Sequence, residues 1–335
     1  METTSGRGIV SVVTPFYNTA RYLRECIESV LNQTYGNFEY ILHDNASDDG
    51  SSDIAREYAA RDSRIRLIRI ETLLPQVPNY NRALTYVSPE SRYCKIVQAD
   101  DWIFAECLDQ MVALADSDPR IGLVSSLRLE GKRVRGEGLS YEQRVLAGRR
   151  AGRLHLLGSA FLFGSPTTVL FRGDIVRARR PFFEENRFQE DTETCFEILK
   201  EWDFGYVHQV LTYSRVAPDS LFSSLSDFDT IPLGNVINLR RYGPHFLAPP
   251  ELGKRWSEAR RWYYGHLAAA LLGARGREYW RFQKEALATE SLSIEAGRLA
   301  WAVAREVMDM LGNPKTTLWR LRQRLRARRD QPRPR

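Results

Sequence analysis

The sequence is poor in cysteine and has no long apolar run. Its 335 residues include four cysteines, none in CxxC spacing: Cys26, Cys94, Cys107 and Cys195. This usage argues against a disulfide framework and against a cysteine zinc site. No apolar stretch approaches the roughly 20 residues that a membrane span needs, and the first residues, METTSGRG, lack the basic and apolar segments of a signal peptide. We therefore expect a cytoplasmic protein.

The net charge of +6 is concentrated at the C-terminal end. Residues 318–335 hold eight arginines and one aspartate, a composition that suits anionic lipid or nucleic acid. Leu318, Leu321 and Leu325 alternate with arginines, which favours a basic amphipathic helix lying on an anionic membrane. A solvated basic end explains the same pattern, so both interpretations stay open.

Between residue 8 and about residue 126, short apolar runs alternate with segments of helical periodicity. The apolar runs are 9–13, 38–42, 65–68, 93–97 and 121–124. After the first run, one helical face is formed by Leu23, Cys26, Ile27, Val30 and Leu31. Strands that alternate with helices at this spacing predict βαβ units and a mostly parallel sheet of the α/β class.

The rest of the chain has a different texture. Residues 127–225 mix short strands, at 167–171 and 206–213, with one helix near 191–200, and beyond about residue 226 the pattern is helical. We expect, in chain order, a domain over 1–225 with halves at 8–126 and 127–225, a helical C-terminal region over 226–317, and a basic tail over 318–335.

The first expected strand, over residues 9–13, is followed by the loop segment Thr14-Pro15-Phe16-Tyr17-Asn18. It lacks the GxGxxG pattern that lets a backbone approach a dinucleotide pyrophosphate, so a redox Rossmann domain is not indicated. Pro15 restricts the backbone, while Tyr17 and Asn18 place a ring and polar groups at the end of the strand, where ligands of parallel sheets bind. A plain turn with a helix cap is the alternative.

The second strand is followed by the acidic stretch His43 to Ser51. A carboxylate at the strand end, that of Asp44, can accept a hydrogen bond from a base N–H such as N3 of uracil. Asp48, Asp49 and Ser51 fit turns and helix caps, because Asp and Ser favour both.

The fourth strand is followed by Gln98-Ala99-Asp100-Asp101-Trp102. Two adjacent aspartates at a buried strand end repel each other, and a divalent cation removes that cost. Mn²⁺ and Mg²⁺ prefer oxygen ligands and often use one or two carboxylates together with phosphate oxygens. We therefore expect Asp100 and Asp101 to hold such a metal against a diphosphate leaving group; a helix cap at Asp101 is the alternative.

A further acidic pair, Glu190 and Asp191, opens the helix expected near 191–200. If this helix folds over the ligand edge, Asp191 can act as a general base toward an acceptor hydroxyl. The alternative is that both carboxylates only complement the dipole at the helix N-terminus.

These motifs, in this order, resemble the family 2 glycosyltransferases with the GT-A fold. The stretches that carry the resemblance are 10–18, 22–35, 44–51, 79–84, 98–101 and 190–191. The resemblance covers about residues 8–225, and it is most specific in the first hundred. It implies a GT-A type, Rossmann-like sheet with a C-terminal helical appendage.

The family resemblance also implies a function. We expect a metal-dependent, inverting hexosyltransferase that moves a sugar from a nucleotide diphosphate donor, with uridine favoured over thymidine or guanosine, to an acceptor hydroxyl in polysaccharide or glycolipid synthesis. Asp191 would be the catalytic base, and Asp100 and Asp101 would hold Mn²⁺ or Mg²⁺. The residues expected to bind the donor are Thr14, Pro15, Tyr17, Asn18, Asp44, Asn81 and Asp100.

The chain departs from the family pattern in three places. Gln98 stands where the first aspartate of a DxD motif is usual, Ala217 stands at a position that often holds histidine, and residues 74–78 replace a glycine-containing loop. The first two departures bear on metal binding, and the third bears on donor contacts.

Two other classes remain as alternatives. A catalytically silent relative that serves as a binding or scaffold protein would fit Gln98 and Ala217. A sugar-nucleotide nucleotidyltransferase would need a glycine-rich basic loop after the first strand, which residues 14–18 do not provide. For a transferase, we expect a saccharide or lipid-linked saccharide acceptor, no nucleic-acid partner, and peripheral contact with the inner face of an anionic membrane through the basic tail.

Overall fold

The computed structural model describes residues 8–187, 189–216 and 228–313. The chain divides into two compact units. We call the first the sheet unit (Met1–Ser220 with His245–Leu247) and the second the helical unit (Leu221–Pro244 with Ala248–Arg335).

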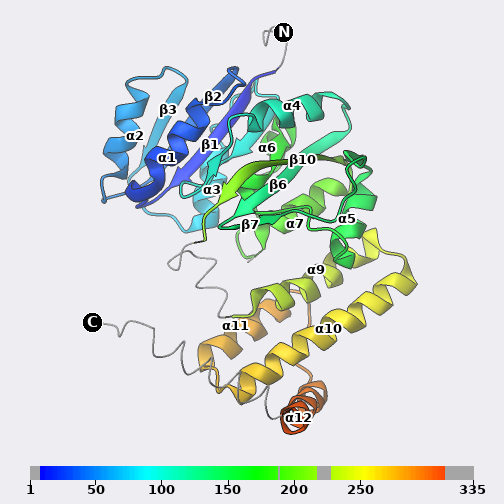
Figure 1. The fold of residues 1–335 in the computed structure, drawn as a ribbon. Coiled ribbons are helices and arrows are strands. Elements are labelled where there is room, and N and C mark those ends of the chain that lie inside the picture. The colour runs from blue at the N-terminus through cyan, green and yellow to red at the C-terminus, as the bar shows by residue number, and fades with distance from the viewer. Residues whose placement is uncertain (1–7, 188, 217–227, 314–335) are drawn as a thin grey trace. The chain divides into compact units, whose positions relative to one another are not determined.

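The sheet unit is built on one mixed sheet to which the described residues contribute ten strands (Figure 1). The main path runs β3-β2-β1-β4-β9-β6-β10-β5, with β7 beside β6 and β8 beside β10. The strands are β1 (Val10–Phe16), β2 (Phe38–Asn45), β3 (Ile65–Ile70), β4 (Tyr93–Ile96), β5 (Trp102–Ile103), β6 (Ile121–Glu130), β7 (Arg133–Arg135), β8 (Val145–Leu146), β9 (Leu170–Arg172) and β10 (Asp203–Ser214). Strands β3, β2, β1 and β4 are parallel to one another, as are β6 and β10, and β9 joins the two groups in antiparallel orientation.

Helices cover the sheet and form the C-terminal region. Those of the sheet unit are α1 (Ala20–Leu31), α2 (Ser51–Ala59), α3 (Gln76–Leu84), α4 (Cys107–Asp116), α5 (Gly148–Leu157), α6 (Gly173–Ala178) and α7 (Glu190–Leu199). The C-terminal region holds α9 (Thr230–Phe246), α10 (Pro249–Leu272), α11 (Arg277–Ala288) and α12 (Ala296–Gly312). The expected α/β fold with a C-terminal helical appendage is therefore confirmed.

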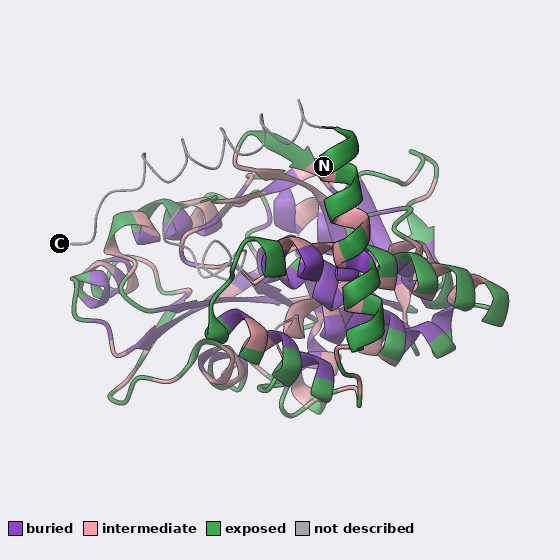
Figure 2. Ribbon diagram, turned by 90° about the horizontal axis from the view of Figure 1, so that it is seen from below, coloured by how far each residue is buried: buried purple, intermediate pink, exposed green. Residues whose placement is uncertain are grey.

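The main core lies between the parallel strands and helices α1, α2 and α4. All residues of β1 are buried, as expected for a strand covered on both faces. Helix α1 buries four of the five residues expected on its apolar face, Leu23, Cys26, Ile27 and Val30. In Figure 2 the strands are mostly buried, whereas the helices expose their outer faces.

Three local expectations need correction. Strand β1 continues to Phe16 and β2 to Asn45, so that Thr14, Pro15 and Asp44 lie within strands rather than in turns. Val13 O accepts a hydrogen bond from Val97 N, so the backbone of Val13 faces β4. Backbone groups two residues apart face the same side of a strand, so the nitrogen of Pro15 also faces that side, where β4 has already ended at Ile96. Pro15 is therefore tolerated, because its missing N–H removes no hydrogen bond between strands.

The other two corrections concern where helix α3 and strand β9 begin. Helix α3 begins at Gln76, within the segment expected as a loop, because Pro78 falls in the first helical turn, where its missing N–H has no intrahelical partner to lose. The strand expected over 167–171 starts later, at Leu170, because Pro166–Thr168 forms a turn of 3₁₀-helix.

No helix in the described part of the chain is both long enough and apolar enough to cross a lipid bilayer.

Candidate functional site

The acidic pair lies directly after the carboxyl end of β4. Asp101 is 4% exposed, while Asp100 is half-buried. Burial, and then the adjacent charge of Asp100, raise the pKa of Asp101 to about 7. The strand thus brings two carboxylates together where keeping both ionised is costly, and a bound cation would lower that cost.

The end of β10 supports this pair from a distant part of the sequence. The backbone N–H of Arg215 donates to Asp101 Oδ1 at 2.9 Å, and the hydroxyl of Ser214 donates to Asp101 Oδ2 at 3.4 Å. The Arg215 side chain donates through Nε to the carbonyl oxygen of Asp100 at 2.9 Å and forms an ion pair with Glu25 of α1. Its guanidinium carbon lies 4.4 Å from the centre of the Tyr22 ring.

Sequence reasoning missed Arg215 as a site residue. Its position immediately after an expected strand was the available signal, since strand ends gather at the ligand edge. Ala217, whose identity bears on metal binding, lies outside the described residues. Gln98, the other departure, donates through its side chain to the Tyr80 hydroxyl at 3.2 Å and through its backbone to Thr167 Oγ1 at 3.0 Å.

The register of the sheet links this pair to the neighbourhood of Asp191. In the parallel pairing of β6 with β10, Ser214 lies opposite Glu130 and Thr212 lies opposite Arg128. Arg128, in turn, is close enough to Asp191 for its positive charge to act on that carboxyl. Strands β4, β10 and β6 therefore lead from the acidic pair toward the start of α7 along one edge of the sheet.

Asp191 lies in the first turn of α7, as expected. Its carboxylate accepts a hydrogen bond from the backbone N–H of Thr192 at 2.6 Å. Burial raises the pKa of Asp191, and burial together with the charge of Asp191 raises the pKa of Glu190 to about 8. A half-buried carboxylate with a raised pKa is a stronger base than an exposed one, which is the property that proton abstraction needs.

The turn after β1 is held by the acidic stretch after β2. Asn18 donates through Nδ2 to Asp48 at 2.8 Å and accepts from the Asp48 N–H at 3.0 Å. Asp49 accepts from Ala20 N, in the first turn of α1, and from Ser51 N. The contact of Asp49 with Ser51 N agrees with the turn role expected for it, whereas the cap expected at α2 is wrong, since Gly50 is the N-cap and no side chain caps the helix. The contacts with Asp48 occupy the side chain of Asn18.

Two other residues expected to bind the donor also have internal partners. The Thr14 hydroxyl is fully buried and lies 3.0 Å from the Tyr40 hydroxyl. Asn81 donates to Phe183 O and accepts from Phe183 N, both at 2.8 Å. By contrast, Tyr17 is 43% exposed and is the most accessible ring of the first turn.

The side chain of Asp44 is fully buried at the end of β2. It accepts hydrogen bonds from Ser47 N at 2.9 Å and from the Ser52 hydroxyl, and it pairs with Arg69 of β3 at 2.9 Å. Because β2 and β3 run side by side, Asp44 fixes Arg69, whose side chain is 38% exposed, at this edge of the sheet.

The residues present fit a divalent metal that is shared with a diphosphate. Among the described residues, no group of three or more histidine, cysteine, aspartate or glutamate side chains is arranged to enclose a metal ion. The available donors are the hard carboxylate oxygens of Asp100 and Asp101, and one or two such ligands are typical where phosphate oxygens complete the coordination of Mn²⁺ or Mg²⁺.

Comparisons with known proteins identify the family of the chain. The model of glycosyl transferase family 2 matches residues 11–180, just over half of the chain. A relative named as a putative glycosyltransferase, EpsE of Bacillus subtilis (strain 168), is 31% identical over 216 residues. These residues cover 63% of this chain and 73% of EpsE. Glycosyltransferase GlyG of Streptococcus pneumoniae serotype 4 is 38% identical over 117 residues, which cover 34% of this chain and 38% of GlyG. The chain therefore belongs to glycosyl transferase family 2.

Solved structures share the fold at low sequence identity. The complex of S. aureus TarS 1–349 with UDP-GlcNAc has a TM-score of 0.62 at 16% identity, and it covers 92% of this chain and 87% of that chain. Mannosyltransferase PcManGT from Pyrobaculum calidifontis, in complex with GDP-Man and Mn²⁺, has a TM-score of 0.56 at 18% identity, with coverages of 94% and 84%. The matched stretch spans little more than a third of the length of GlyG.

Proposed function

We propose that the chain transfers a sugar, with inversion at the anomeric carbon, from a UDP-sugar to an acceptor hydroxyl in the synthesis of a cell-surface polysaccharide or glycolipid. The observation that carries this proposal is the buried carboxylate of Asp101 beside Asp100 at the end of β4, in a chain of this family. UDP-GlcNAc in TarS supports the choice of uridine, and GDP-Man in PcManGT keeps guanosine as an alternative to be tested.

In this proposal Asp191 takes the proton of the acceptor hydroxyl. The acceptor oxygen forms its bond to the anomeric carbon while the bond from that carbon to the donor diphosphate breaks, and the electron pair leaves with the diphosphate. A divalent metal held by Asp100 and Asp101 would neutralise the charge of the diphosphate. Arg215 and Thr167 hold the acidic pair in place, the first through Asp100 O and Asp101 Oδ1 and the second through the Asp101 side chain.

The donor site divides into groups that reach the ligand and groups that shape the site. We assign base stacking to the exposed ring of Tyr17 and metal or ribose contact to Asp100. Asp44 contributes by holding Arg69 at the edge, since a base N–H would reach its carboxylate only after one of its present partners moved. Thr14, Pro15, Asn18 and Asn81 form the scaffold behind the donor.

The test is the release of nucleoside diphosphate from UDP-, TDP- and GDP-sugars, each measured with Mn²⁺, with Mg²⁺ and with EDTA. We expect release from a UDP-sugar that requires the metal and that falls about 10²- to 10⁴-fold in Asp191→Asn, the range attributed to a general base. Asp174→Asn is the matched control, because Asp174 also lies in the first turn of a helix but pairs with Arg172.

Equal rates for Asp191→Asn and the wild type would remove Asp191 from its role. Binding of UDP and Mn²⁺ in a thermal shift, with no release from any of the sugars, would support the silent binding protein instead, since a ligand that binds the native state raises its apparent stability whether or not it reacts.

A further inference from the structure

Helix α12 of the helical unit exposes an apolar face. Of its residues only Ala302 is buried. The exposed residues Trp301, Ala304, Met308 and Leu311 recur at the i, i+3, i+7 and i+10 spacing of a single helix face, and their neighbours Ala300 and Val307 are exposed as well. Trp301 and Met308 are each 64% exposed and Leu311 is 77% exposed. In Figure 2 the helix that precedes the grey C-terminal trace is exposed along most of its length.

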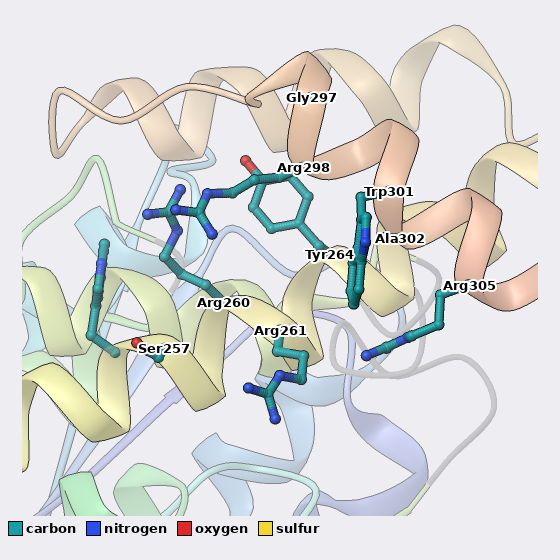
Figure 3. A pocket seen from close by; sticks show the side chains of 10 residues that line it. Ser257, Arg260, Arg261, Tyr264, Gly297, Arg298, Trp301, Ala302 and Arg305 are labelled. Atoms are coloured by element: carbon teal, nitrogen blue, oxygen red, sulfur yellow. The ribbon is translucent and has the colours of Figure 1, made fainter.

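A groove of about 530 Å³ runs beside this face, between α10 and α12 (Figure 3). Four of the described residues that line it are arginines, Arg260 and Arg261 from α10 and Arg298 and Arg305 from α12, and none of these lining residues is acidic. The remaining lining residues are Trp256, Ser257, Tyr264, Gly297, Trp301 and Ala302. Trp301 belongs to both features, since it lines the groove and also begins the apolar face.

The arginines differ in how far their charge is already neutralised. Glu295, at the N-cap of α12, pairs with both Arg260 and Arg298. The guanidinium of Arg305 lies 5.5 Å from the Trp301 ring centre, and Arg261 is exposed. Glu295 thus pairs with two of the four arginines, and none of the described residues that line the groove is acidic, so the lining keeps a positive charge at the border of the apolar face.

The apolar face of α12 together with the arginine groove favours an anionic lipid surface as the binding partner. A second copy of the chain placed on the same face would bring arginines against arginines, at a cost in like-charge repulsion. The basic residues 318–335 carry the same sign and would be repelled from the groove. An anionic phospholipid surface matches both parts, since its phosphates attract the arginines while its acyl boundary accepts tryptophan and aliphatic side chains.

We propose that the α12 face and the arginine groove dock the chain on an anionic lipid bilayer. In this arrangement Trp301, Met308 and Leu311 enter the boundary between headgroups and acyl chains, and Arg261 and Arg305 lie among the lipid phosphates. The proposal goes beyond sugar transfer and does not depend on it, because it rests only on surface residues of the helical unit.

The experiment is co-sedimentation of the full chain with vesicles of phosphatidylcholine, with and without phosphatidylglycerol, at low and high salt. We expect binding to the anionic vesicles that weakens with salt, because surface charge interactions are screened. The triple variant Trp301→Ser/Met308→Ser/Leu311→Ser is expected to bind at least about tenfold more weakly, since three interfacial apolar side chains are lost. The control variant Val134→Ser/Tyr141→Ser removes exposed apolar side chains of the sheet unit and is expected to bind like the wild type.

Charge is tested separately with Arg261→Gln/Arg305→Gln, for which we expect a loss of about fivefold per arginine on anionic vesicles and no change on neutral ones. Unchanged circular dichroism and Tm will show that the variants fold, as expected for substitutions at exposed positions. All variants keep the basic residues 318–335. Binding of the triple variant equal to that of the wild type would therefore assign the membrane contact to those residues and overturn the proposal.

A position-specific probe gives a second readout. The four native cysteines are buried, so an Ala304→Cys variant can be labelled selectively with an environment-sensitive dye, with Ser140→Cys as the labelled control. We expect a blue shift of the dye at residue 304 on anionic vesicles and none at residue 140. A shift that appears without vesicles and grows with protein concentration, together with a larger mass in light scattering, would show that a second copy covers α12 and would contradict the lipid proposal.

Discussion

The ammonium group of Lys95 donates a hydrogen bond to the carbonyl oxygen of Thr167 at 2.5 Å, beneath the candidate active site. Lys95 lies in β4 and is fully buried; its second carbonyl contact is Val169 O at 3.4 Å. Thr167 also bonds Asp101 through its side chain and accepts the N–H of Gln98. Burial lowers the pKa of Lys95, and the charge of Asp101 acts in the opposite direction. A buried lysine side chain thus supports the segment that holds the acidic pair.

Replacing this lysine tests whether that support matters. Lys95→Met keeps the length of the side chain and leaves the two carbonyl oxygens without their donor, so we expect the free energy of unfolding to fall by about 1–3 kcal/mol in urea titrations. We also expect a higher Mn²⁺ concentration for half-maximal activity, because Thr167, whose side chain bonds Asp101, loses the Lys95 contact that holds its backbone in place. Lys200→Met, an exposed lysine paired with Glu197, is the matched control. A variant that loses stability but keeps its Mn²⁺ response would assign Lys95 a structural role only.

The pH profile of transfer should identify Asp191 as the base. A general base works in its deprotonated form, and burial raises the pKa of Asp191, so kcat/KM should fall as the pH is lowered through that raised pKa. Asp191→Asn should lose this acid limb along with most of the activity. If the acid limb persists in Asp191→Asn, the titrating group is another residue.

The neighbouring Glu190 should act on stability rather than on the rate at neutral pH. Its pKa is raised to about 8 in the folded chain, against an ordinary value of 4.5. The unfolded chain therefore binds fewer protons than the folded chain between these values, and stability falls as the pH rises from about 4.5 to about 8. Glu190→Gln removes this dependence, so we expect its Tm to exceed that of the wild type at pH 8 and to approach it near pH 4.5. Glu201→Gln, at an exposed position, should show no such difference.

Metal dependence should be traceable to Asp101. With EDTA we expect no release of nucleoside diphosphate. We also expect UDP together with Mn²⁺ to raise the Tm more than UDP without the metal does. Asp101→Asn should lose the Mn²⁺-dependent part of this shift, because a carboxylate ligand becomes a neutral amide. A full Mn²⁺ effect in Asp101→Asn would place the metal elsewhere.

Arg215 should matter more for catalysis than its surface ion pair suggests. Arg215→Gln removes the Nε–H bond to Asp100 O as well as the pairing with Glu25. Displacement of the acidic pair by as little as about 1 Å can cost up to about 10²-fold, so we expect kcat to fall by an order of magnitude or more. Glu25→Gln removes only the exposed partner and should change kcat by less than about twofold, since such pairs contribute little. Similar losses in the two variants would show that the ion pair itself is what matters.

Several elements could be predicted from the sequence because their signals are local. The apolar spacing of residues 23–31 predicts the buried face of α1, and the acidic pair at 190–191 predicts the start of α7. Asp100 and Asp101 could be placed at the end of a strand for the same reason, since a short apolar run and the polar residues after it are adjacent in the chain. The family motifs of the first hundred residues add to these local signals.

The partners of the polar side chains could not be predicted in this way. Asn18, Asp44 and Asn81 were expected to bind the donor, and the structure gives each of them an internal partner far along the chain, Asp48, Arg69 and Phe183 respectively. The C-terminal ends of strands β1 and β2 were predicted several residues too early for a related reason. Pairing between strands decides where a strand ends, and the pairing partner is remote in sequence.

By itself, the sequence determined which segments become strands and helices, where the carboxylates stand at their ends, and the family to which the chain belongs. The tertiary structure alone decided that Lys95, Thr167 and Arg215 converge on Asp100 and Asp101, and that α12 keeps an apolar face exposed beside four arginines. The physical reason is that periodicity and capping act within a few residues, whereas hydrogen-bond partners and exposed faces depend on strand order and helix packing, which join residues that are far apart in the chain, 72 positions for Lys95 with Thr167 and 114 for Asp101 with Arg215.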